Sequence, residues 1–207
     1  MASLFDPVTD AITQLKKLTP ANLKKLGNQR LSDLITQEAL RSKKRVADLQ
    51  ERYPSADTRE LCQRLVDSKK HLAQLTGGIS GALGIFSVPP DMLIMAWLEL
   101  SLTSDIATLY KVNLKGERGK QEVLDLFYEM NGIPAYQRES PKVLGKIAGL
   151  LAAKLGSETI GRALPLVGAP ISMYFNSQHI QFVGEQAKRH FEGFGKAHEK
   201  TKKASAG

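Results

Sequence analysis

The residues best suited to chemistry are polar side chains set into otherwise apolar helical stretches. Glu99 lies in the apolar run that follows Pro90, and Asn176 and His179 lie in a later amphipathic stretch. Residues three apart share a helix face, so Asn176 and His179 lie on one side of their helix. If the two stretches pack together, Glu99 meets Asn176 or His179, and a buried carboxylate beside an imidazole is one mark of an acid–base site. Glu99 and His179 are therefore the candidate catalytic residues.

The alternative is that these polar groups only stabilise the fold. A buried polar group without a partner is costly, so such side chains usually bond to one another or cap helix ends. Asp91, Asp105 and Arg162 also lie in apolar surroundings and fit this description. Asp91 in particular needs only a position in the first turn of a helix, where a carboxylate is favourable. We favour the structural role and expect no catalysis.

Other catalytic and metal-binding motifs are missing from the sequence. The histidines form no HExxH-like pair, and neither a GxSxG motif nor a P-loop occurs. The single cysteine, Cys62, excludes an internal disulfide and has no obvious base nearby in the sequence, so we expect a structural thiol. The sequence thus predicts neither a metal nor a cofactor.

An apolar ligand site is a further candidate. Residues 71–110 contain no Lys or Arg, although the chain carries a net charge of +8. Methionine side chains adapt to irregular apolar ligands, which makes the methionine-rich part of this stretch a candidate pocket lining. Packing in the core is the alternative for the same side chains. The predicted ligand-binding residues are Met92, Met95, Trp97, Glu99, Met173, Asn176 and His179.

Basic residues gather toward both ends of the chain, which suits contact with anionic lipid. Solvated surface helices are the alternative. Nucleic acid is not an expected partner, because the link over 53–56 contains Pro54 and lacks the glycine turn of a helix-turn-helix. The N-terminus has no basic segment followed by an apolar one, so we expect a cytoplasmic protein that can associate with a membrane. The predicted basic surface consists of Arg41, Lys43, Lys44, Arg45, Lys200, Lys202 and Lys203.

The elements that position these residues are all helical, since every strong periodic signal is helical and no strand pattern competes. Asp57, with Glu60 three residues later, is a helix-capping pattern. Thr76-Gly77-Gly78 is expected to end the helix that begins there. Helices are predicted at about 32–52, 57–76, 91–110, 121–130, 141–155 and 171–191.

The predicted architecture is an all-α, compact single-domain bundle of about six to eight helices. Its core contains two apolar, proline-broken segments, with the helix over 91–110 packed against the helix over 171–191. We expect an N-terminal lead-in with amphipathic turns over 1–30, a helical domain over 31–192 and a basic flexible tail over 193–207.

Two blocks of the sequence share one design, in which a glycine-rich apolar approach and a proline break precede an apolar helix. Over about residues 70–192, the order and separation of these blocks resemble those of the EcsC family of bacterial proteins. The chain departs from the family pattern at Lys111, where glycine is usual, and at Pro89 and Pro170. The matching residues are Gly78 to Gly84, Pro90-Asp91, Asp105 to Tyr110, Leu164 to Ala169, Asn176 and Ala187 to Phe191.

The resemblance implies a compact all-helical protein that works near membranes, because the founding member accompanies an ABC transporter. It implies no established reaction. Our first hypothesis is a cytoplasmic protein that binds a membrane surface or a lipid-like ligand through the apolar segments 79–98 and 143–175, with its basic ends meeting phosphate headgroups. One alternative is an adaptor or cargo subunit of a bacterial assembly that uses helices 32–76. The other is a hydrolase that uses Glu99 and His179.

Overall fold

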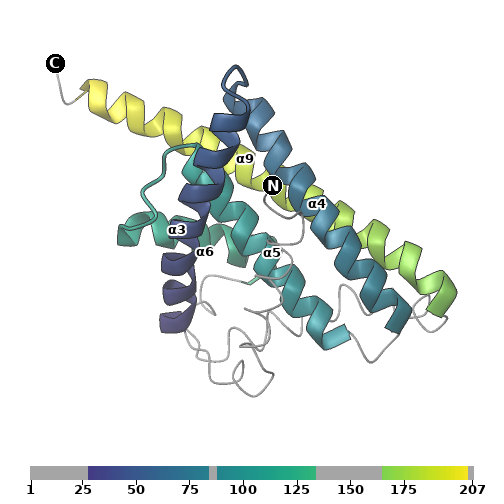
Figure 1. The fold of residues 1–207 in the computed structure, drawn as a ribbon. Coiled ribbons are helices and arrows are strands. Elements are labelled where there is room, and N and C mark those ends of the chain that lie inside the picture. The colour runs from purple at the N-terminus through teal and green to yellow at the C-terminus, as the bar shows by residue number, and fades with distance from the viewer. Residues whose placement is uncertain (1–27, 84–87, 134–164, 205–207) are drawn as a thin grey trace.

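The computed structural model describes residues 28–83, 88–133 and 165–204, which form five helices and, within these ranges, no strand (Figure 1). The prediction of an all-α fold is therefore confirmed. The helix predicted over 141–155 and the lead-in before residue 28 lie outside the described residues. The helices are α3 (Asn28–Arg52), α4 (Thr58–Leu83), α5 (Val88–Leu109), α6 (Glu117–Met130) and α9 (Pro165–Ala204).

Helix α5 is the central element of the described residues. It contacts α3, α4, α6 and α9, and every residue from 98 to 107 is buried. Its sequence is apolar on all sides rather than along one stripe, which is typical of a helix that is surrounded by other helices. The polar residues of α5 must therefore find their partners inside the protein.

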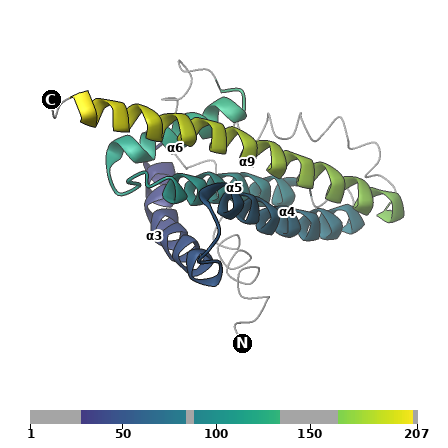
Figure 2. The same ribbon diagram turned by 90° about the horizontal axis from the view of Figure 1, so that it is seen from above.

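Helices α4 and α9 lie side by side and run antiparallel, as both ribbon views show (Figures 1 and 2). Two hydrogen bonds join the helices. Gln74 Nε2 donates to Ser177 Oγ at 3.4 Å, and Lys70 Nζ donates to Gln181 Oε1 at 3.0 Å. The predicted packing of α5 on α9 is present, but α9 makes its longest contact with α4.

A glycine allows this close approach. A Cβ atom added at Gly184 in α9 would lie 2.3 Å from Cγ2 of Val66 in α4, closer than side chains tolerate. Because Val66 is buried and β-branched, it has little freedom to move aside.

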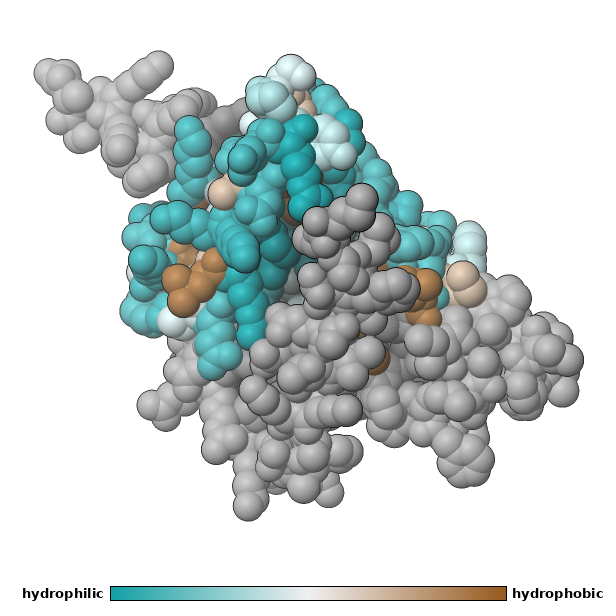
Figure 3. Space-filling view, viewed as in Figure 1, coloured by the Kyte–Doolittle hydropathy of each residue, from teal (hydrophilic) through white to brown (hydrophobic). Residues whose placement is uncertain are grey.

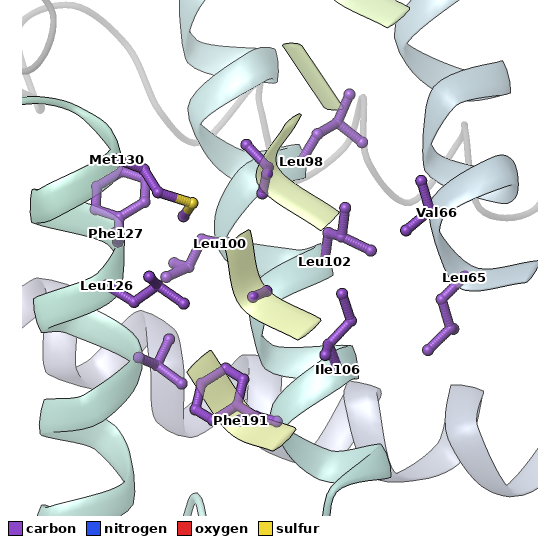
Figure 4. Packing of buried hydrophobic residues seen from close by; sticks show 14 of the residues in the cluster. Leu65, Val66, Leu98, Leu100, Leu102, Ile106, Leu126, Phe127, Met130 and Phe191 are labelled. Atoms are coloured by element: carbon purple, nitrogen blue, oxygen red, sulfur yellow. The ribbon is translucent and has the colours of Figure 1, made fainter. Parts of the chain in front are cut away.

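The hydrophobic core is one cluster to which all five described helices contribute. The close view in Figure 4 shows labelled side chains from α4, α6 and α9 around those of α5. Those labelled are Leu65 and Val66 from α4, Leu98, Leu100, Leu102 and Ile106 from α5, Leu126, Phe127 and Met130 from α6, and Phe191 from α9.

The helix ends follow recognisable rules. Asp57 Oδ1 accepts a 2.8 Å hydrogen bond from the backbone N–H of Glu60, which confirms the predicted cap of α4. Helices α5 and α6 both end in a Schellman motif, in which the chain turns through a residue with positive φ. That residue is Gly132 after α6, with φ 68°, and Lys111 after α5, with φ 62°.

The largest differences from the sequence prediction are at the end of α4 and at both ends of α9. Helix α4 continues through Gly77-Gly78 to Leu83 instead of ending there, so the glycines lie inside a helix. Helix α9 begins at Pro165, which suits the first helical position, so the predicted break over 165–170 is helical. Helix α9 also extends to Ala204, because the Lys, Ala and Glu residues of the predicted flexible tail are good helix formers.

Candidate functional site

The first polar cluster joins α5, α9 and the end of α6 around the carboxylate of Glu99. Glu99 is fully buried, with 0% exposure. Its Oε1 contacts Nε2 of His179, and its Oε2 accepts a 2.8 Å hydrogen bond from Nδ2 of Asn131. The predicted contact between Glu99 and His179 is therefore present, and Asn131 is a third member that sequence reasoning missed. We call these three residues the Glu99 cluster.

The turn at the end of α6 holds Asn131 in place. Its backbone N–H bonds to the carbonyl of Phe127 at 3.2 Å, and its side-chain Nδ2 donates to the same carbonyl at 2.8 Å. The following residue, Gly132, supplies the positive φ that turns the chain. Asn131 Oδ1 is buried and has no hydrogen-bond partner within the described part of the chain.

The arrangement is chemically suited to orienting an imidazole. A carboxylate that accepts from one ring nitrogen fixes the tautomer and leaves the other nitrogen able to accept a proton. The side chain of His179 is 19% exposed, so solvent reaches the ring, whereas Glu99 and Asn131 are enclosed.

A second polar cluster lies on the other side of α5, against α3. Arg45 of α3 donates from Nε to both oxygens of Asp105, at 2.9 and 3.1 Å, and from Nη2 to Oδ1 at 2.6 Å. Its Nη2 also bonds to Oε1 of Glu38. Asp105 is fully buried and Glu38 nearly so. Arg45 therefore bridges two carboxylates that come from different helices.

Lys69 of α4 completes this cluster. Its Nζ donates to Ser101 Oγ at 2.6 Å and lies 3.6 Å from Asp105 Oδ2. Ser101 Oγ in turn donates to Glu38 Oε1 at 2.8 Å. Two cations thus balance two carboxylates in the interior, which is the condition for retaining charges there. We call Glu38, Arg45, Lys69, Ser101 and Asp105 the Asp105 cluster.

The surroundings of the Asp105 cluster lower the pKa of both Glu38 and Lys69, which favours the charged form of Glu38 and disfavours that of Lys69. Burial alone would raise the pKa of Glu38, but the nearby charges of Arg45 and Lys69 outweigh it and lower the pKa below its ordinary value of 4.5. Burial lowers the pKa of Lys69, and Asp105 opposes that effect only in part. Elsewhere, burial raises the pKa of the Cys62 thiol to about 11, which fits the predicted structural role.

The other predicted ligand-binding residues lie on α5 and α9. Met95 lies in the core and Trp97 is partly buried, with the Lys69 ammonium 5.3 Å from the centre of its ring. Asn176 is buried, whereas Met173 is 37% exposed on α9. The side chain of Met92 lies outside the described residues.

The predicted basic surface requires one correction. Lys43 and Lys44 are exposed and Arg41 is partly exposed, as expected. Arg45 instead turns inward, because two buried carboxylates bind its guanidinium. The side chains of Lys200, Lys202 and Lys203 lie outside the described residues.

The inward position of three polar residues on α3 was not predicted, although their spacing in the sequence indicates it. Glu38, Ser42 and Arg45 recur at spacings of four and three, so they lie close to the inward stripe that carries Ile35 and Val46. Ser42 Oγ lies 2.9 Å from the carbonyl oxygen of Ser104 on α5. Polar residues on an inward stripe require polar partners on the helix that they face.

Neither a membrane-spanning helix nor a metal-binding group occurs among the described residues. None of these helices combines the length and the apolar character that crossing a bilayer requires. Within the same ranges, no group of three or more His, Cys, Asp or Glu side chains is arranged to hold a metal ion.

Comparison with protein-family models, with curated proteins and with solved structures gives no significant match to this chain. The resemblance to the EcsC family therefore stays a prediction.

Proposed function

We propose that this protein binds an anionic membrane surface, or a lipid-like ligand presented there, through the outer face of α3. The observation that carries the proposal is an exposed leucine beside lysines. Leu40 is 62% exposed, and Lys43 and Lys44 follow it at three and four residues, so the three side chains share one helix face. A leucine enters the headgroup boundary while the lysines pair with phosphates. We call these three residues the α3 face.

The character of the surface supports shallow contact rather than insertion. Over α3 and α4 the described surface is mainly hydrophilic in the view of Figure 3, with separate hydrophobic residues between the polar ones. The net charge of +8 adds a general attraction to anionic lipid. Electrostatic attraction with little apolar burial gives reversible, salt-sensitive association.

The proposal also covers the family, the number of helices and the site of a lipid-like ligand. We infer an EcsC-like, cytoplasmic protein of six to eight helices whose two apolar segments line a site for a lipid-like ligand. The segment over 79–98 contains the end of α4 and the first half of α5, and the segment over 143–175 includes the first residues of α9. What supports this part is the concentration of apolar residues in the segment around Pro90, which contains no Lys or Arg.

Co-sedimentation of the full chain with vesicles tests the proposal. One set contains phosphatidylcholine alone and the other adds phosphatidylglycerol, each at low salt and at about 0.5 M salt, where screening is strong. Binding is expected only to the anionic vesicles and only at low salt. Absence of binding to anionic vesicles at low salt would remove the proposal.

A hydrolase is the second candidate, and the contact between Glu99 and His179 favours it. Hydrolysis of a panel of p-nitrophenyl esters by the wild type is compared with hydrolysis by Glu99→Gln and His179→Gln. His190→Gln is the matched control, because His190 also lies on α9 and pairs with a carboxylate, that of Glu122, at 3.1 Å. Activity that survives both Glu99 and His179 substitutions, or falls equally in the control, excludes this candidate.

The adaptor hypothesis stays a prediction. A mild pull-down that returns one stoichiometric partner, without lipid, would favour it over membrane binding.

A further inference from the structure

Helix α9 carries a row of exposed side chains on the face that is turned away from its neighbours. Ile180 and Ala187 are buried on its inward face, and α4 and α5 lie along the same side of the helix in Figure 2. The residues of the opposite face follow one another at spacings of three and four, so they form one line along the helix. These exposed residues, which we call the α9 stripe, are Tyr174, Gln178, Phe182, Glu185 and Arg189.

The first half of the α9 stripe presents aromatic side chains to solvent. Tyr174 is 60% exposed and Phe182 is 44% exposed. Phe175, which is partly exposed, packs edge-on against the ring of Tyr174, with the ring centres 5.6 Å apart. Tyr and Phe are enriched at interfaces between proteins, because their rings supply a large contact area.

The second half of the α9 stripe presents polar side chains that are already oriented. Gln181 Nε2 donates to Glu185 Oε1 at 3.1 Å, and Gln181 Oε1 accepts from Lys70 Nζ of α4 at 3.0 Å. Arg189 Nη2 lies 3.9 Å from the other oxygen of Glu185. Side chains that are held in place before association lose less conformational entropy when they bind.

The order of residue types along the α9 stripe complements its own reverse. Tyr174 and Arg189 are equally distant from the point between residues 181 and 182, and so are Gln178 and Glu185. A second copy of α9 that crosses antiparallel at this point therefore places its Arg189 against Tyr174 and its Glu185 against Gln178. The first pair is a cation–π contact and the second a hydrogen bond from an amide to a carboxylate. The two Phe182 side chains meet at the centre, and every other contact is made twice, as two-fold symmetry requires.

Other occupants of the α9 stripe match it less well. A parallel second copy would place Glu185 beside Glu185 and Arg189 beside Arg189, and like charges that face one another oppose association. An anionic membrane surface would attract Arg189 but repel the Glu185 carboxylate one turn away. An antiparallel copy satisfies both charges and covers the aromatic rings.

We infer that two copies of this chain form a symmetric antiparallel dimer through the α9 stripe. At 1.5 Å per residue the contact from Tyr174 to Arg189 is about 22 Å long, a length over which two helices at a crossing angle of about 20° stay in contact. An interface of one helix face is small, so we expect a reversible dimer with a dissociation constant on the order of 10–100 µM.

Sedimentation velocity of the full chain tests whether the dimer forms, at protein concentrations from about 5 to about 500 µM, a range that brackets the expected dissociation constant. The wild type should shift from monomer to dimer across this range. Phe182→Glu should weaken the dimer at least about tenfold, because it replaces the central ring contact by two facing carboxylates. Leu75→Glu is the matched control, since Leu75 is also 44% exposed but lies on α4, and it should dimerise like the wild type. Circular dichroism checks that both variants are folded.

Cross-linking tests the antiparallel arrangement. Gln178→Cys and Glu185→Cys are prepared with tags of different mass, mixed, and treated with a short bismaleimide. The native Cys62 is buried, so the introduced thiols are the ones expected to react. The antiparallel dimer brings residue 178 of one copy beside residue 185 of the other. Cross-links should therefore form mainly between the two different variants.

Three results would overturn the inference. A wild type that stays monomeric at about 500 µM excludes a dimer of the expected strength, and this measurement needs no variant. Equal weakening by Phe182→Glu and Leu75→Glu would show that the association does not use the α9 stripe. Cross-linking of Gln178→Cys mainly to itself would exclude the antiparallel arrangement. The inference is independent of the α3 face, because vesicle binding is measured at protein concentrations well below the dimer dissociation constant, where the chain is monomeric.

Discussion

Arg45 on α3 binds Asp105 on α5 with two nitrogen donors, and Asp105 is fully buried. This pair fixes the rotation of α3 against the central helix, because the guanidinium reaches Asp105 only when this face of α3 is turned toward α5, while Glu38 on α3 itself holds the guanidinium in place. The Asp105 cluster therefore positions the α3 face with respect to the rest of the protein.

Replacing Arg45 by alanine is expected to destabilise the protein by about 3 kcal/mol, because it leaves two buried carboxylates with one fewer cation. This figure is at the low end for a buried pair, since the Arg45 side chain is 30% exposed. Arg41→Ala is the matched control. Arg41 is equally exposed, lies one turn earlier, and is 3.6 Å from Glu38, so its loss should cost less than about 1 kcal/mol. Urea unfolding of both variants measures the difference, and equal losses would contradict the assigned role of Arg45.

The Asp105 cluster should also make stability depend on pH. The folded-state pKa of Glu38 is lowered below 4.5, so the charged carboxylate stabilises the fold above that pH. That stabilisation is lost as the pH falls through the folded-state pKa. Glu38→Gln should therefore be less stable than the wild type at neutral pH, and the gap should narrow below about pH 4.5. Urea unfolding midpoints of both proteins across this pH range test the prediction. A stability difference that stays constant with pH would show that the charge of Glu38 does not stabilise the fold.

The structural features that could be predicted from the sequence are those that depend on residues within one segment. The all-helical fold and the Asp57 cap follow from spacing within one segment, and both are present. The contact between Glu99 and His179 could also be predicted, because polar residues within apolar helices have few alternatives to one another.

Arg45 shows why the rest could not be predicted. Its neighbours Lys43 and Lys44 predict a solvated basic turn. Arg45 turns inward instead because it binds Asp105, a partner 60 residues away in the sequence. Similarly, Gly77 and Gly78 have low helix propensity and predict an end to α4, yet the helix continues to Leu83. In both cases the tertiary surroundings override a local preference.

The close approach of α4 and α9 predicts opposite effects for two glycines of α9. Gly184→Ala should destabilise the protein by about 1–3 kcal/mol, because its methyl group overlaps Val66. A Cβ at exposed Gly193 meets nothing within 4 Å, so Gly193→Ala should stabilise by about 0.5–1 kcal/mol through helix propensity. Thermal unfolding of both variants provides the measurement. Two shifts of the same sign would mean that the helices are not packed at this distance.

The two Schellman turns predict a second pair of opposite effects. Lys111 has φ 62° and Gly132 has φ 68°, a conformation that is costly for any residue with a Cβ. Lys111→Gly should therefore stabilise by about 0.5–1 kcal/mol, and Gly132→Ala should destabilise by about 1 kcal/mol. Guanidinium unfolding decides the point, and a destabilising Lys111→Gly would indicate that the lysine side chain makes a contact worth more than the strain.

The most direct test of membrane binding is charge reversal on the α3 face. The dissociation constant of the full chain for vesicles with phosphatidylglycerol is measured for Lys43→Glu/Lys44→Glu and for Arg59→Glu/Arg189→Glu. The second variant makes the same change in net charge at two side chains that are 72% and 73% exposed on α4 and α9. We predict at least about tenfold weaker binding for the α3 variant, since each basic residue near the surface contributes about 1 kcal/mol, and a much smaller effect for the control. Equal weakening of the two variants, or unchanged binding by the α3 variant, would contradict the assignment of the α3 face as the membrane contact.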